Sequence, residues 1–120
     1  MAKRKQVQTA SQPGRTEPLP PLDQAWAAYG AEDLAQAQRI VGELLPQAPG
    51  DVEAAYLAGL VWRAQGKAQE ARLAFQTVVD NHHQIEDHTR GRMLRRLAVG
   101  HLNQITRGVW DLEPETWERA

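Results

Sequence analysis

The 120-residue chain contains no cysteine, one serine and one phenylalanine, and it has no long apolar run. Without cysteine there is no disulfide framework, no thiolate metal site and no cysteine nucleophile. The one serine, Ser11, lies in a polar stretch near the start, so a serine triad is not expected. No segment approaches the roughly 18 apolar residues of a transmembrane helix, and residues 1–15 lack the apolar centre of a signal peptide. We therefore expect a single-domain cytoplasmic protein without a membrane role.

The net charge of −1 hides a difference between the start of the chain and the rest. Residues 1–15 carry four basic and no acidic side chains, whereas the other 105 residues carry 10 basic and 15 acidic ones. This mildly acidic body argues against general nucleic-acid binding. Residues 1–20 are polar and proline-rich, and they bury too little apolar surface to offset the entropy of ordering. We predict a disordered basic tail over 1–20 and a folded domain over 21–120.

The folded domain is predicted to be all-helical. Apolar residues recur at spacings of three and four, and no segment alternates with the period of two that strands show. Asp33 and Asp51 stand where they can cap helices, and Gly66 and Gly108 stand where helices end. The expected helices cover residues 22–30, 34–45, 52–65, 67–80 and 86–106. A last short helix is expected after Pro114, carrying Trp117.

A repeat of 34 residues runs through this pattern. Counting back 34 residues places Ala71, Phe75 and Val78 on Ala37, Val41 and Leu44. The glycine in the middle of the third expected helix, Gly59, costs about 1 kcal/mol relative to alanine. That cost is acceptable where a neighbouring helix must approach closely, as in a tightly paired helical hairpin. Each hairpin leaves one apolar face uncovered, so the hairpins must stack.

The second unit reads Ala55-x-x-Ala58-Gly59-x-x-Trp62, then Gly66, then Ala71-x-x-x-Phe75. This order resembles the tetratricopeptide repeat, with small and aromatic residues at the matching places. The resemblance implies a short α-α superhelix, or solenoid, of antiparallel hairpins. The first repeat would cover about residues 21–50 and the second about 51–84.

A partial third unit is expected over about residues 85–120. Leu97-Ala98-Val99-Gly100 resembles Tyr56-Leu57-Ala58-Gly59, but 41 residues later rather than 34. We expect the long helix to cover the second repeat, with Trp110 and Trp117 folding back over the end. The alternatives are a loose tail over 110–120, or a tail that docks on a partner.

Residues that could carry chemistry are few. One cluster has metal-ligand types, and it consists of His82, His83, Glu86, Asp87 and His88. Its spacing does not match a known helical zinc motif and no second cluster supplies further ligands, so we read it as a hydrated connector. The glycines form no phosphate-binding loop and the carboxylates occupy solvent-facing helix positions. We predict neither catalytic residues nor a metal or other cofactor, and therefore no enzyme.

The resemblance implies a protein–protein interaction module that binds a partner segment in the groove lined by the first helix of each repeat. The groove residues of this chain would be Trp26, Tyr29, Glu53, Tyr56, Leu57, Leu60 and Arg63. This set is aromatic and aliphatic and suits an apolar segment or helix. Several of these side chains can instead pack against the long third-unit helix.

A basic face on the long helix supplies the rival functions. Arg90, Arg92, Arg95 and Arg96 form either a solvated surface or a docking site for an acidic partner or RNA backbone. An RNA-associated helical protein is therefore one alternative. A self-assembling structural subunit, a homo-oligomer built through the apolar ends of a short stack, is the other.

Overall fold

The computed structural model describes residues 19–112, and within this range the chain is helical with no strand. This confirms the expected all-helical class. The helices are α2 (Pro21–Gly30), α3 (Leu34–Gln47), α4 (Val52–Ala64), α5 (Ala68–Asn81) and α6 (His88–Arg107), with a 3₁₀ turn, η2 (His82–Gln84), before α6. Residues 1–18 of the expected tail over 1–20, and the expected helix after Pro114 with Trp117, lie outside the described residues.

Aspartates begin three of the helices. Asp33 Oδ1 accepts a hydrogen bond from the backbone N–H of Gln36 at 3.2 Å, and Asp51 Oδ1 accepts from two backbone N–H groups at 3.1 Å. Asp87 caps α6 in the same way through the N–H of Arg90. That cap sets the start of α6 at His88, two residues later than the expected start at residue 86. Gly108 ends α6 with a φ of 76°.

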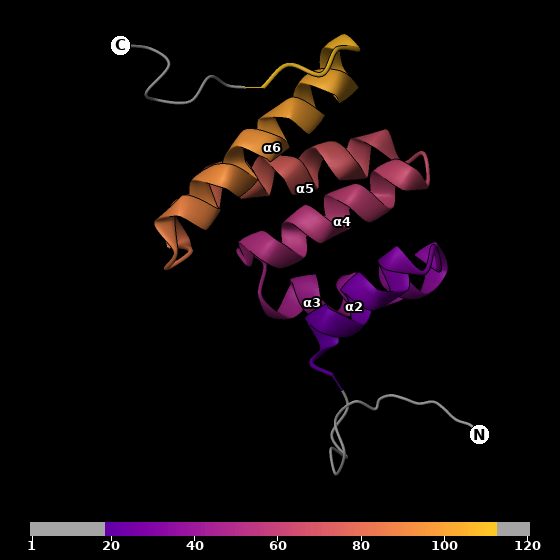
Figure 1. Ribbon diagram of the computed structural model, residues 1–120. Helices are drawn as coiled ribbons and strands as arrows, with labels where there is room; N and C mark the ends of the chain where they lie inside the picture. The colour runs from indigo at the N-terminus through magenta and orange to yellow at the C-terminus, as the bar shows by residue number, and fades with distance from the viewer. Residues whose placement is uncertain (1–18, 113–120) are drawn as a thin grey trace, which may run out of the picture.

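Each helix packs against its neighbours along the chain, and α2 also contacts α4. Figure 1 shows the resulting order, with the α2–α3 pair at one end, the α4–α5 pair in the middle and α6 at the other end. Two apolar clusters hold the molecule together. One joins α2 and α3 to α4 and includes Ala74 of α5, and the other joins α4 and α5 to α6. Trp26, Leu45 and Trp62 pack against both clusters.

The helices α4 and α5 make their closest described contact at a glycine, at Gly59 of α4. A Cβ atom at Gly59 would lie 2.6 Å from Cε1 of Phe75 on α5. Phe75 has no exposed surface, so its ring has no room to move aside. The sequence predicted a close approach at this glycine, and the structure confirms it with one difference. The atoms that occupy the space belong to an aromatic side chain, not to the backbone of the neighbouring helix.

Replacing Gly59 by alanine is expected to lower the free energy of unfolding by about 1–3 kcal/mol, because the added methyl group overlaps the buried Phe75 ring. Gly42→Ala in α3 should do the opposite and raise it by about 1 kcal/mol, since no atom lies within 4 Å of the new methyl. Urea unfolding of both variants measures the difference. Equal stability of the two variants would contradict the close packing of α4 on α5.

Candidate functional site

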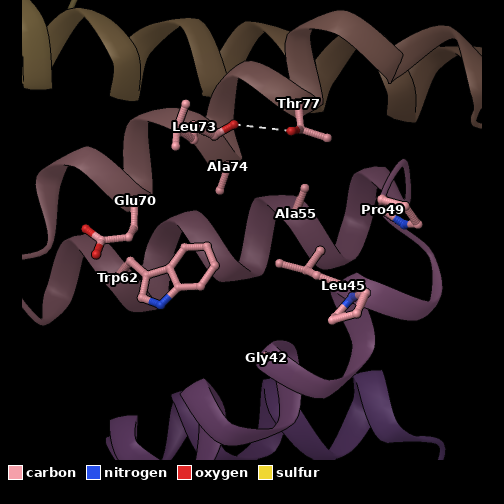
Figure 2. Close-up of a pocket in the computed structure, with 10 residues that line it drawn as sticks. Gly42, Leu45, Pro49, Ala55, Trp62, Glu70, Leu73, Ala74 and Thr77 are labelled. Atoms are coloured by element: carbon pink, nitrogen blue, oxygen red, sulfur yellow. Dashed lines mark hydrogen bonds between the residues drawn. The ribbon is translucent and has the colours of Figure 1, made fainter.

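An open cleft of about 440 Å³ is lined by α3, α4 and α5, and Figure 2 shows α4 running between the other two helices. Most of the residues that line it are apolar, and they come from all three helices and the α3–α4 connection. They are Gly42, Leu45, Pro46, Pro49, Ala55, Trp62, Glu70, Leu73, Ala74 and Thr77. A concave apolar surface with a few polar groups at its edge is the usual form of a binding site.

Two large side chains give the cleft its apolar character. Trp62 is half-buried: it packs against both apolar clusters and also lines the cleft. Leu73 lines the cleft from α5 and is 57% exposed. Packing on the two clusters therefore accounts for only part of the Trp62 surface. Glu70 is the charged residue of the lining.

Gly42 is the unusual member of the lining. It stands in the interior of α3, where glycine costs about 1 kcal/mol relative to alanine, yet no atom lies within 4 Å of the position its Cβ would take. The other interior glycines each make room for a neighbour. Gly59 admits Phe75, Gly91 admits the carbonyl oxygen of His82, and Gly100 admits residues that follow α6. Within residues 19–112, packing therefore accounts for these three glycines and leaves Gly42 facing open space.

The predicted groove residues separate into two groups. Leu57 is fully buried, and Tyr56 is 9% exposed. Glu53 forms an ion pair with Arg90 of α6, with Oε1 and Nη2 2.6 Å apart. Trp26, Tyr29 and Leu60 are half-buried and keep part of their surface, and the rings of Trp26 and Tyr29 pack edge to face at 6.2 Å.

A buried histidine that the sequence reading did not single out joins α4 to α6. His101 is 8% exposed, and its ring stacks on Phe75 with centroids 4.5 Å apart and planes 5° from parallel. Its Nδ1 lies 3.1 Å from Nη1 of Arg63, and its Nε2 lies 3.3 Å from the hydroxyl of Tyr56. Arg63 also donates to Gln104 Oε1. The predicted groove residues Tyr56 and Arg63 therefore hold α6 in place.

These contacts fix the charge state of His101. A guanidinium can only donate, so Nδ1 must accept from Arg63, and the ring proton sits on Nε2, where it can be donated to the Tyr56 oxygen. Burial, together with the positive charge of Arg63, lowers the pKa of His101 to about 4. Burial also raises the pKa of Tyr56. The cluster is thus built around a neutral imidazole.

The predicted basic face is mostly engaged in contacts. Arg90 pairs with Glu53, and Arg95 and Arg96 are half-buried and have partners of their own. Arg92 is exposed and lines a pocket of about 200 Å³. Three histidines of the connector, His82, His83 and His88, line the same pocket.

The connector holds no helix that aligns its metal-ligand types. Residues 82–84 form η2 and Asp87 is the cap of α6, so His82, His83, Glu86 and Asp87 do not lie on one α-helix. Among residues 19–112, no group of three or more histidine or acidic side chains is placed to hold a metal ion. Over the same range, no helix is both long and apolar enough to cross a membrane.

Comparison with models of protein families, with curated proteins and with solved structures finds no significant match to this chain. The assignment of function therefore rests on the geometry of the cleft, the groove residues and the His101 cluster.

Acidification is expected to destabilise the protein through His101. Its pKa is about 4 in the folded state and about 6.5 when unfolded. As the pH falls, the unfolded chain therefore takes up the proton first. The contribution of neutral His101 to the free energy of unfolding is nearly complete above about pH 6.5 and is lost as the pH falls toward 4. The free energy of unfolding decreases by at most about 3 kcal/mol in total through this group, and about 2 kcal/mol of that decrease occurs between pH 6.5 and pH 5.

Urea unfolding between pH 7 and pH 5 measures this dependence. His101→Phe is the control, since it keeps a ring to stack on Phe75 but binds no proton. The variant should show a clearly flatter dependence on pH than the natural chain. Equal slopes for the two proteins would show that His101 is not the titrating group.

Proposed function

We propose that the chain is a short α-solenoid of the tetratricopeptide type. The residues that the 34-residue repeat makes equivalent occupy equivalent surroundings, which supports the proposal. Ala37 and Ala71 are both fully buried, as are Val41 and Phe75. The α2–α3 and α4–α5 hairpins follow one another, and α6 adds the first helix of a partial third unit. A solenoid of this size presents a large surface relative to its core, which suits binding rather than catalysis.

The function that this surface supports best is that of a cytoplasmic protein–protein interaction module that docks a partner in the cleft between α3 and α5. Gly42 is the observation that carries this proposal. A helix-interior glycine with no internal neighbour is costly, and a side chain or backbone from a partner supplies the missing neighbour. The half-buried Trp62 and exposed Leu73 then gain cover on binding.

The lining also indicates the kind of partner. An amphipathic helix fits best, because its ridge of apolar side chains can lie between α3 and α5 with its closest approach at Gly42. Glu70 at the edge favours a basic residue beside that ridge. Pro46 has no N–H to donate to the Gly42 carbonyl within α3. The Gly42 carbonyl oxygen therefore lacks its usual helical donor, and a donor group of the partner could bind it.

The groove predicted from the sequence is the second surface for the same function. Trp26, Tyr29 and Leu60 keep exposed surface there, whereas Tyr56, Arg63 and Glu53 contact α6. A partner in this groove would contact the half-buried aromatic pair and Leu60. The two surfaces can be tested separately because they share no residue.

Gly42→Leu should fill the cleft and weaken partner binding by at least about tenfold, as expected for a lost interface hot spot. Gly30→Leu is the matched control: it has the same chemistry, lies at the end of α2 and also has nothing within 4 Å. Tyr29→Ala with Leu60→Ala tests the groove. Affinity purification of each tagged variant, with bound proteins quantified by mass spectrometry, gives the readout.

The expected result is loss of a specific partner with Gly42→Leu and its retention with Gly30→Leu. Loss only with the groove variant would move the docking surface to α2 and α4. A set of bound proteins that is the same for every variant would refute docking at either surface. Bound RNA that dissociates steeply with salt, or a mass by light scattering that rises with concentration, would instead favour one of the two rival functions.

A further inference from the structure

The connector between α5 and α6 has two sides of opposite character. Its two acidic residues, Glu86 and Asp87, line a pocket that is shared with the start of α4. Its histidines line a different pocket of about 200 Å³ together with a residue of α6, and no described carboxylate lines this pocket. We call it the histidine pocket, and its lining consists of His82, His83, Ile85, His88 and Arg92.

A glycine of α6 lets the two walls of the histidine pocket come together. His88, Gly91 and Arg92 share one face of α6, since they are three and four residues apart. A Cβ atom at Gly91 would lie 2.6 Å from the backbone oxygen of His82, so η2 lies directly on the first turns of α6. The histidines of η2 are thereby held beside His88 and Arg92 by backbone packing.

Arg92 supplies the permanent positive charge of the histidine pocket. Arg90 pairs with Glu53, and Arg95 and Arg96 have partners of their own. Arg92 is exposed, and it forms no hydrogen bond or ion pair with any residue between 19 and 112. A guanidinium only donates hydrogen bonds, and its planar fork matches two oxygens of a phosphate or a carboxylate.

The histidines can add donors to this charge. His82 Nδ1 lies 3.0 Å from the backbone oxygen of Val79, so Nδ1 carries the ring proton and donates it to that oxygen. Nε2 of His82 is then the nitrogen that can take up a second proton and become a donor. A negatively charged ligand favours this uptake, because it stabilises the imidazolium form.

The position of the pocket at the start of α6 also favours an anion. The N-terminus of a helix carries a partial positive charge, which disfavours cations and attracts anions. The first turn of α6 nevertheless contains His88 and Arg90 and no acidic residue, and Arg92 follows in the next turn. A bound anion would offset the repulsion between these basic groups and the helix end.

The acidic side chains closest in sequence do not occupy this place. Asp80 of α5 accepts a hydrogen bond from Gln76, and Asp87 caps α6 through the N–H of Arg90. Glu86 and Asp87 line the pocket at the start of α4. None of the three lines the histidine pocket. The charged and titratable groups that face a ligand there are therefore the three histidines and Arg92.

We propose that the histidine pocket binds a phosphate dianion, as inorganic phosphate or as the phosphate group of a monoester. Arg92 would donate to two of its oxygens, and the histidine rings would donate to the others as they take up protons. A phosphate monoester carries a charge of about −1.5 to −2 at pH 7, which one guanidinium and one imidazolium balance. A volume of about 200 Å³ is below the roughly 300–1,000 Å³ of pockets for larger ligands and suits a single phosphate group.

This site is separate from the cleft and the groove, and it does not depend on the function proposed for them. Histidine ring signals in NMR spectra of the full chain test it. The chain has four histidines, and the buried His101 serves as an internal reference. Inorganic phosphate or methyl phosphate, added at pH 7 with EDTA and constant ionic strength, should shift the other three signals in a saturable way. Binding should weaken about fivefold from pH 7 to pH 8, because it is coupled to proton uptake.

Arg92→Gln should weaken binding at least about tenfold, since it removes the permanent charge. Arg39→Gln is the matched control, because Arg39 is an exposed arginine of α3 that does not line the pocket, and it should leave binding unchanged. Both changes are at exposed positions, and circular dichroism checks that both variants remain helical. Dimethyl phosphate, a diester with a single negative charge, should bind at least about tenfold more weakly than methyl phosphate.

The two probes also separate the sources of the phosphate group. Methyl phosphate that binds as tightly as inorganic phosphate identifies a monoester as the ligand, whereas much weaker binding identifies the free ion. The proposal is overturned if neither probe gives saturable shifts up to about 10 mM. Equal affinities of the Arg92 and Arg39 variants, or of the diester and the monoester, would overturn it as well.

Discussion

The contact on which most of the structure depends is the insertion of the Phe75 ring beside Gly59. The missing side chain on α4 lets the ring of α5 lie fully buried between the two helices. Tyr56 meets the same ring edge to face at 5.8 Å, and His101 stacks on it from α6. One aromatic residue of α5 therefore contacts both α4 and α6. The groove face of α4 and the position of α6 both follow from this contact.

The interior glycines relate this packing to the proposed docking cleft. Gly59 of α4 and Gly100 of α6 each leave room for an aromatic ring from the chain that follows, that of Phe75 and that of Trp110. Gly42 carries the same cost in α3 without a ring to receive. In the core, the space beside a helix-interior glycine is filled by an aromatic ring. In the proposed complex, a side chain of the partner would fill the space beside Gly42 as Phe75 and Trp110 fill theirs.

The sequence predicted the helices well because their signals are local. Asp33 and Asp51 were identified as caps from residue type and spacing alone, and Gly66 and Gly108 as helix ends. The His101 cluster could not be predicted in this way. Its partners Tyr56 and Arg63 lie 45 and 38 residues away, and the stacking on Phe75 depends on how α6 packs against α4 and α5. The cleft could not be predicted from the sequence, because an exposed glycine such as Gly42 adds nothing to the apolar periodicity that indicates which helix faces pack together.

The packing of each helix on its neighbours along the chain has a kinetic consequence. Almost every contact between elements joins helices that are adjacent in sequence, so few long loops must close before the core forms. Chains with such local topology fold quickly, on a scale of microseconds to milliseconds. Because α4 contributes to both apolar clusters and Trp26, Leu45 and Trp62 pack against both, opening of the α2–α3 end would expose part of the surface that α4 buries. Residues of α3 line one side of the cleft, so a transient opening of the α2–α3 end would also widen the cleft.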